Sequence, residues 1–494
     1  MSKRSYFALF FCVFIPLISL TAQDGFGFGF ADGSDDAGAA PSPIPAAPSV
    51  KISGEVSAKL LGYIDDFSSF STLKETTLGD IFAGKLNFFA SALNAEGVVN
   101  LQLSPVFDGS ASPVELGEAY LRAYFGNFSV EGGLRKLTWG KADSFGPLDV
   151  VNPIDYRDLT EMTNLMDRKI ARPMVHASYT LGSFSKLEGV FIPWFQGHRF
   201  ADAGRWAPSQ VTAYPGLIGS EINAEIQRLQ SVPQEHWPSD VHEDLKNAGG
   251  IQKIQDHYAN MAIASLYPGT LGLEYLQGGM RFTTTAGSSD IGIQYFSGCL
   301  FRPAIMVIGQ DGFLQNPYGI TPQAVFNRYH QIGADYAQVI AGFNLRAELA
   351  ANITGDLAGD DGAVYNPSIG WSAGFDRDVV WGINLNLQAT ESVRLLHDKV
   401  GDSIILDTEA GTGITATRIT LIISKKFLRD ELEIKATGIW GIEDKDFYIL
   451  PALIWTKWDL KLEVSGGFLG GDGQGELGQY HKNSFIRTSL TYSF

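Results

Sequence analysis

The dominant feature of the chain from residue 51 onward is a regular alternation of apolar and polar residues. In segment 51–65, for example, Ile52 and Val56 fall on one face while Glu55 and Lys59 fall on the other. A period of two predicts a β-strand with one apolar and one polar face. The same alternation recurs through most of the remaining sequence.

The alternating segments are long and numerous. Many are about twice the five or six residues usual for a strand of a globular protein, and they match the ~9–11 residues of a tilted membrane strand. We identify about 18 such segments, and about 16 is the nearest alternative number of strands. They are 51–65, 80–92, 95–104, 116–126, 127–139, 172–182, 184–195, 270–284, 288–301, 328–341, 342–354, 367–376, 378–389, 413–427, 430–442, 446–456, 457–470 and 482–494.

The connections between these segments alternate in length. Connections from even to odd segments are short, as at Leu93-Asn94, Gly126-Asn127 and Asp376-Arg377, whereas the others are long except Glu443 to Asp446. Such parity is typical of a membrane barrel with tight turns at one end and long loops at the other. The expected fold class is therefore an all-β, transmembrane antiparallel β-barrel.

Composition narrows the function classes. The 494 residues include 37 basic and 54 acidic ones, a net charge of −17, which argues against nucleic-acid binding. With only Cys12 and Cys299, the chain has no intramolecular disulfide framework once its N-terminus is removed.

The N-terminus has the pattern of an export signal. Lys3 and Arg4 precede an apolar stretch, and Leu20-Thr21-Ala22 offers a small-residue cleavage site. We predict a signal peptide over 1–22, followed over 23–50 by a Gly/Phe-rich and Pro/Ala-rich flexible tether. An uncleaved anchor helix is the alternative.

The other end of the chain carries a second sorting signal. Leu490, Tyr492 and Phe494 share one face of the last strand. This arrangement resembles the C-terminal assembly signal of Gram-negative outer-membrane β-barrels. The resemblance implies recognition by the barrel-assembly machinery and a location in the lipid of the outer membrane.

The stretch after segment 127–139 is the most distinctive motif. Trp139-Gly140 followed by Asn152-Pro153-Ile154-Asp155 resembles a loop of a largely uncharacterised family of Gram-negative outer-membrane proteins. The resemblance implies a porin-like barrel and names no substrate. Loop 140–171 is either a solvated surface loop or a constriction folded into the pore, which we favour. The constriction candidates are Asp143, Asp149, Asp155, Arg157, Asp158, Glu161, Arg168 and Lys169.

The polar faces of the strands form the other candidate surface. Charged residues there are costly in a dry core but normal along an aqueous lumen. The predicted lumen-facing charges are Lys51, Glu55, Lys59, Glu118, Arg122, Arg346, Glu348, Lys435, Lys461, Glu463 and Arg487.

The longest interruption, 196–270, shows helical spacing in part. Its His236, His242 and His257 fit no zinc-binding spacing, so we expect no metal and no cofactor. No nucleophile, base and acid occur at a recognisable spacing, so we expect no enzyme.

Together these features predict an outer-membrane porin-like channel for passive diffusion of small hydrophilic solutes. The alternatives are a plugged transporter for a specific or hydrophobic ligand and a surface-display barrel such as an adhesin. Homo-oligomerisation is left open.

Overall fold

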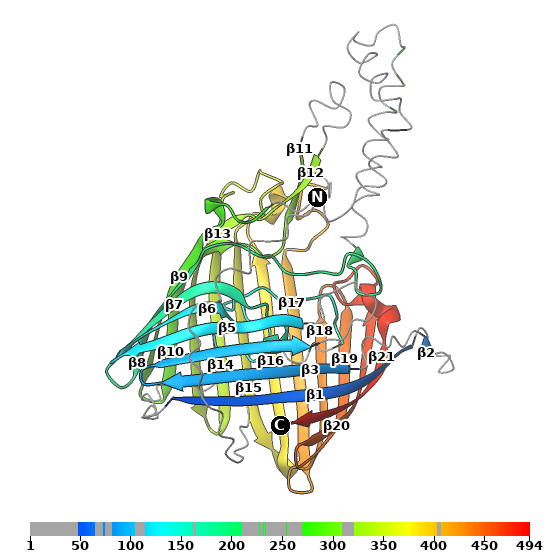
Figure 1. The fold of residues 1–494 in the computed structure, drawn as a ribbon. Helices are drawn as coiled ribbons and strands as arrows, with labels where there is room; N and C mark the ends of the chain where they lie inside the picture. Colours follow the sequence, from blue (N-terminus) through cyan, green and yellow to red (C-terminus); the bar gives the residue numbers. More distant parts are fainter. Residues whose placement is uncertain are drawn as a thin grey trace. The chain divides into compact units, whose positions relative to one another are not determined.

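The computed structural model describes residues 48–64, 73–74, 82–103, 114–160, 162, 165–209, 227, 231, 233, 253, 269–308, 321–402 and 407–494. Within these residues, 18 antiparallel strands form a closed barrel. Figure 1 shows this barrel from one side. Closure is made by β1 (Ser49–Ile64), which pairs with both β3 (Phe82–Ala92) and β21 (Phe485–Ser493). The predicted fold class and strand number are confirmed.

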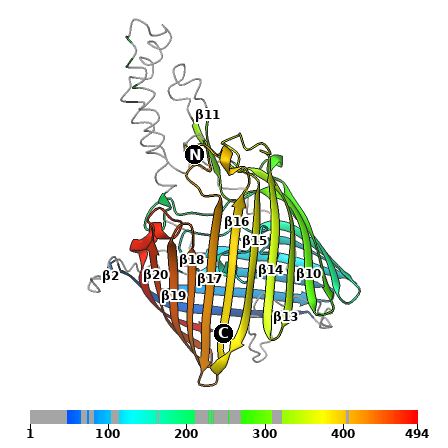
Figure 2. The ribbon, with the colours of Figure 1, turned by 180° about the vertical axis from the view of Figure 1, so that it is seen from behind.

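The remaining barrel strands follow one another around the wall in chain order. They are β4 (Ala95–Leu103), β5 (Val114–Phe125), β6 (Phe128–Arg135), β7 (Arg172–Leu181), β8 (Ser185–Ile192), β9 (Gln277–Ala286), β10 (Ser289–Cys299), β13 (Arg328–Ile340), β14 (Phe343–Thr354), β15 (Ser368–Val379), β16 (Ile383–Arg394), β17 (Thr415–Phe427), β18 (Leu432–Gly441), β19 (Asp446–Lys457) and β20 (Leu460–Gly471). Figure 2 shows β13 to β20 side by side on one wall.

Short elements complete the described chain. The strand β2 (Leu73–Lys74) pairs with the end of β1, and β11 (Ala304–Ile308) pairs with β12 (Thr321–Val325) in a separate hairpin. The helices are α1 (Leu165–Arg168), η4 (Leu273–Tyr275), η6 (Val380–Gly382), η7 (His397–Lys399) and η8 (Gly478–Asn483). None of the helices in the described ranges is long and apolar enough to cross a membrane.

Two predicted strand boundaries are wrong in an informative way. Asp376 and Arg377, expected to form a turn, pair in the ladder with Asn386 and Leu385, and the chain reverses over Val380–Gly382. Trp381 and Gly382 both have positive φ there, which a tight reversal requires. Segment 127–139 ends as a strand at Arg135, because the following residues bind inside the barrel instead.

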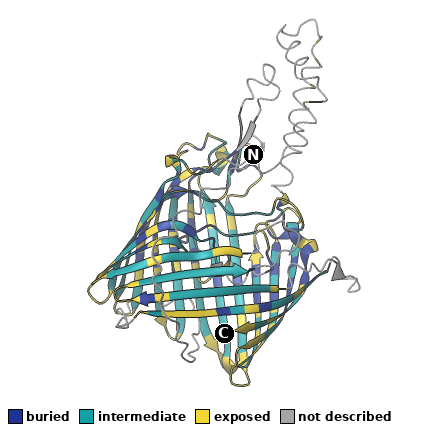
Figure 3. Ribbon diagram, in the orientation of Figure 1, coloured by how far each residue is buried: buried dark blue, intermediate teal, exposed yellow. Residues whose placement is uncertain are grey.

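The distribution of exposure around the wall is inverted relative to a soluble protein. On β13, Gln331 and Asp335 are 1% and 3% exposed, whereas Ile332 and Tyr336 are 58% and 38% exposed. Figure 3 shows this alternation of exposed and covered positions along the strands. The outward face of the barrel is therefore apolar and the inward face polar, as a membrane-spanning wall requires.

Several sequence predictions concern residues outside the described part of the chain. Segments 1–22 and 23–47 lie outside the described residues, and so do the spans of 196–270 that show helical spacing, apart from single positions. Glu161 also lies outside the described residues.

Candidate functional site

The candidate site is built by residues 136–171, which join β6 to β7 and which we call the inner segment. Its two ends are tied together by Asn152, which is 2% exposed. The Asn152 carbonyl accepts from the Leu137 N–H at 2.8 Å, and its amide donates to the carbonyls of Arg135 and Ile170, both at 2.9 Å. The Asn-Pro motif therefore closes the base of the segment.

A buried ion pair lies beside this closure. The Lys169 ammonium, whose side chain is 1% exposed, is 2.7 Å from the Asp149 carboxylate. It also donates to the Leu137 carbonyl and the Thr138 hydroxyl. Lys169 and Asp149, two constriction candidates, thus hold the fold of the inner segment itself.

An apolar cluster fastens the first part of the segment to the wall. Trp139 is 2% exposed and packs edge-on against Phe296 of β10, with ring centroids 6.2 Å apart. Val151 and Tyr329 belong to the same cluster. The Trp139 ring thus faces the interior of the barrel, whereas Trp381 and Trp458 are exposed.

Glu348 of β14 holds the next part of the segment. Its carboxylate accepts hydrogen bonds from the backbone N–H groups of Lys141, Ala142 (2.7 Å) and Leu148 (3.3 Å). A Cβ added to Gly140 or Gly146 would lie 2.2 or 2.6 Å from a Glu348 carboxylate oxygen. These glycines therefore let the backbone wrap a carboxylate from the wall.

Three neutral amides of the wall continue this attachment. Gln388 of β16 accepts from the N–H groups of Asp143 and Ser144 and donates to the Phe145 carbonyl. Gln331 donates to the Pro147 carbonyl and Gln294 to the Leu148 carbonyl, each at 2.9 Å. The inner segment thus follows the interior face of β10, β13, β14 and β16. None of these three amides was predicted as a site residue.

Asp143 joins the segment to charged groups of the wall. Its carboxylate pairs with Arg346 and accepts from the Asn386 amide at 2.8 Å. Arg346 also lies 2.8 Å from Asp376. Burial raises the pKa of Asp143, while the Arg346 charge acts in the opposite direction.

A second apolar cluster fastens the far part of the segment to the opposite side of the barrel. Leu159 packs with Tyr448 of β19 and Phe485 of β21, and the Tyr448 hydroxyl donates to the Leu159 carbonyl at 2.6 Å. Trp206, from the stretch after β8, joins this cluster and donates to the Tyr63 hydroxyl at 3.1 Å. Two chain segments therefore fill this part of the interior.

The tip between the clusters contains Asp155, Arg157 and Arg168. Arg157 lies 2.6 Å from the Asp155 carboxylate and keeps 48% of its side chain exposed, while Arg168 donates to the Asp155 carbonyl. Hydrogen bonds from Arg157 lower the pKa of Asp155 although burial opposes this. Asp158 accepts from the N–H and hydroxyl of Thr160.

His198 supports this tip from the stretch after β8. Its Nδ1 accepts from the Ile154 N–H at 2.9 Å, and its ring packs edge-on against Tyr156. Burial, helped by the Arg302 charge, lowers the pKa of His198 to about 3. His198 is therefore neutral at pH 7, as the accepted hydrogen bond requires.

Several of the other predicted lumen-facing charges lie in two groups of ion pairs. On the wall of β4 to β7, Arg122 lies 2.6 Å from Glu131 and 3.4 Å from Glu96, and Arg135 lies 2.8 Å from both Glu118 and Glu131. On β20 and β21, Glu463 lies 3.0 Å from Lys461 and 2.8 Å from Arg487. Among the others, Glu55 lies 4.0 Å from Lys85, whereas Lys51, Lys59 and Lys435 belong to neither group.

The arrangement brings together most of the predicted site residues. The polar positions of the wall, including Arg346, Glu348 and Arg487, bind the inner segment or one another, and the segment's own charges are largely paired. Among the described residues, no cluster of three or more His, Cys, Asp or Glu side chains could hold a metal ion.

No protein-family model and no curated protein sequence matches this chain. Among solved structures, it is similar to OccAB4 of Acinetobacter baumannii at 8% identity and a TM-score of 0.47, over 91% of this chain and 99% of that one. A BenF-like porin from Pseudomonas fluorescens gives 8% and 0.46, over 92% and 99%. Salmonella typhi OmpF in complex with daunomycin gives 9% and 0.40, over 90% and 97%.

Proposed function

We propose that this protein is an outer-membrane channel through which small hydrophilic solutes diffuse passively. The observation that carries the proposal is a closed barrel with an apolar outward face and a polar inward face, along which a long segment is bound. The sequence signals for export and barrel assembly support the location.

The size of the barrel supports a water-filled passage. A barrel of 18 strands is wider than its own wall side chains can fill, so it leaves a channel unless other segments occupy it. The inner segment occupies part of this space and carries both signs of charge at Asp143, Asp155 and Arg157. We therefore assign it the role of a constriction that selects by size and charge.

Single-channel recording tests the proposal. The mature protein, residues 23–494, is refolded into a planar bilayer, and its folded state is checked by the difference in gel mobility with and without heating. We expect stepwise increases in current that persist over a range of applied voltages. Silence from folded, inserted protein would contradict an open channel.

A second candidate is a transporter whose lumen is filled until a ligand arrives. It is favoured by one observation: Leu159, Met162 and Trp206, from two different segments, are buried together against the wall. In that case the same recording would show low conductance that rises on adding the ligand.

A further inference from the structure

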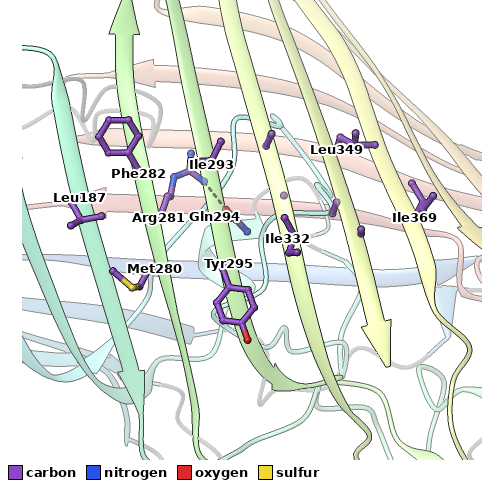
Figure 4. A pocket seen from close by; sticks show the side chains of 14 residues that line it. Leu187, Met280, Arg281, Phe282, Ile293, Gln294, Tyr295, Ile332, Leu349 and Ile369 are labelled. Carbon is purple, nitrogen blue, oxygen red and sulfur yellow. Dashed lines mark hydrogen bonds between the residues drawn. The ribbon is translucent and has the colours of Figure 1, made fainter. Parts of the chain in front are cut away.

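The outward face of the barrel carries a groove in addition to the features of the lumen. It has a volume of about 690 Å³ and lies over β8, β9, β10, β13, β14 and β15. Figure 4 shows its side chains, with Leu187 and Met280 at one edge and Leu349 and Ile369 at the other. The groove thus crosses six adjacent strands of the membrane-facing wall.

The exposed lining of this groove is apolar. Met280, Ile293, Ile332 and Leu349 are each 55–58% exposed. Small residues, Ala334 and Ala351, lie between these larger side chains. The polar residues Arg281 and Gln294 are buried and bind each other at 2.9 Å on the inward side. A flexible hydrocarbon chain fits such a lining, because it adapts to a narrow apolar depression.

One end of the groove is polar and basic. The ring of Tyr295 lines the groove, and its hydroxyl lies 2.7 Å from Nδ1 of His330. Arg328 lies two residues farther along β13 and donates to the carbonyls of Glu274 and Leu276. No described carboxylate forms an ion pair with Arg328, and its contact with the exposed Glu274 is through the backbone carbonyl of that residue. An aromatic ring between an apolar floor and basic groups is typical of a membrane interface.

We propose that this groove binds one anionic lipid, with a hydrocarbon chain along Ile293, Ala334 and Leu349 and a phosphate beside His330 and Arg328. The inference rests on the proposed membrane location of the barrel. A second copy of the chain is the less suitable occupant, since its wall offers broad convex packing and not a thin chain joined to an anionic group.

Native mass spectrometry of the full mature chain in a non-ionic detergent tests the inference. The probes are phosphatidic acid and phosphatidylcholine with identical acyl chains. We expect one retained phosphatidic acid, preferred over phosphatidylcholine by about five-fold, the effect typical of one basic residue near a headgroup. Equal retention of both lipids would overturn the headgroup assignment.

Matched variants locate the site. Filling the groove with Ala334→Leu and Ala351→Leu should abolish retention, whereas Ala436→Leu, an exposed alanine on β18, should leave it unchanged. His330→Gln with Arg328→Gln should remove the preference for phosphatidic acid while the apolar lining stays intact. If the filled variant retained as much phosphatidic acid as the wild type, the proposal would be overturned. A lipid-free dimer of the wild type that the filled variant no longer forms would also overturn it, because a second copy of the chain would then occupy the groove.

A conductance recording on the same preparation separates the two proposals. Selective lipid retention without conductance would contradict the channel but keep the lipid site. Conductance without selective lipid retention would contradict the lipid site but keep the channel. If the filled variant fails the gel-mobility test for folding, the double surface variant His330→Gln with Arg328→Gln decides alone, since a loss of the lipid preference supports the site and an unchanged preference contradicts it.

Discussion

Gly54 and Phe494 exchange two backbone hydrogen bonds, of 2.9 and 3.0 Å, across the seam where the first and last strands of the barrel meet. A Cβ on Gly54 would lie 2.6 Å from both the Lys85 carbonyl oxygen and the Phe494 ring. The glycine thus gives the terminal aromatic residue the space it needs to complete the closure.

Gly54→Ala should therefore weaken the closed barrel by about 1–3 kcal/mol, the usual cost of overpacking. We expect the folded barrel to lose its characteristic gel mobility at a lower temperature than the wild type does. Gly438→Ala on β18 is the control, because nothing lies within 4 Å of its added Cβ. Equal stability of both variants would show that the seam tolerates the added methyl group.

Replacing Glu348 tests the attachment of the inner segment. Glu348→Ala leaves the N–H groups of Lys141, Ala142 and Leu148 without their acceptor, at a cost on the order of 3 kcal/mol. We expect larger and noisier single-channel currents from a released segment. Glu433→Ala, a wall carboxylate that binds no described residue of the segment, should behave like the wild type. Unchanged currents in Glu348→Ala would argue that the segment does not limit flow.

Replacing Asn152 tests the closure at the base of the same segment. Asn152→Ala removes three buried hydrogen bonds and should lower the free energy of unfolding by about 3 kcal/mol. Proteolysis should then cut the inner segment faster than in the wild type. Asn384→Ala, which removes an exposed hydrogen bond to Asp378, serves as the control. Similar cleavage of both variants would rule out this role for Asn152.

Arg157 and Arg168 test charge selection at the tip. Arg157→Gln with Arg168→Gln should raise the ratio of cation to anion permeability, on the order of two-fold, because two positive charges leave the passage. The reversal potential in a salt gradient measures this ratio. Lys457→Gln changes a basic residue that stacks on Trp458 at a tight turn and should have no effect. Unchanged selectivity in the double variant would remove the tip from the constriction.

The low pKa of His198 predicts how the stability of the protein depends on pH. Its pKa is about 3 in the folded protein, below the ordinary 6.5, so between these values the unfolded chain binds a proton that the folded chain does not. Stability should fall as the pH drops through this range, by at most about 1.4 kcal/mol per pH unit. His198→Gln should show a shallower decline between pH 6.5 and pH 4, measured by denaturant unfolding. An identical slope in both proteins would contradict the assignment.

The sequence predicted the strands better than it predicted the site. Alternation identified all the barrel strands because a membrane wall separates apolar from polar side chains at every residue. It placed the reversal at Asp376-Arg377 wrongly, because two charged residues suggested a turn where Trp381 and Gly382 provide one. It also missed Gln294, Gln331 and Gln388, since a neutral amide looks like any other polar position. The burial of Trp139 could not be predicted, because it depends on partners such as Phe296 that are remote in sequence.

The contact between Ala142 and Glu348 spans 206 residues and has a consequence for the order of folding. Residues 136–171 precede in the chain the wall strands from β10 to β21, which hold most of the segment. Closing so long a stretch of chain is entropically costly until the intervening hairpins have formed. We therefore expect the segment to dock after these strands have paired, so that a newly formed barrel passes through a stage whose lumen is wider than in the final state.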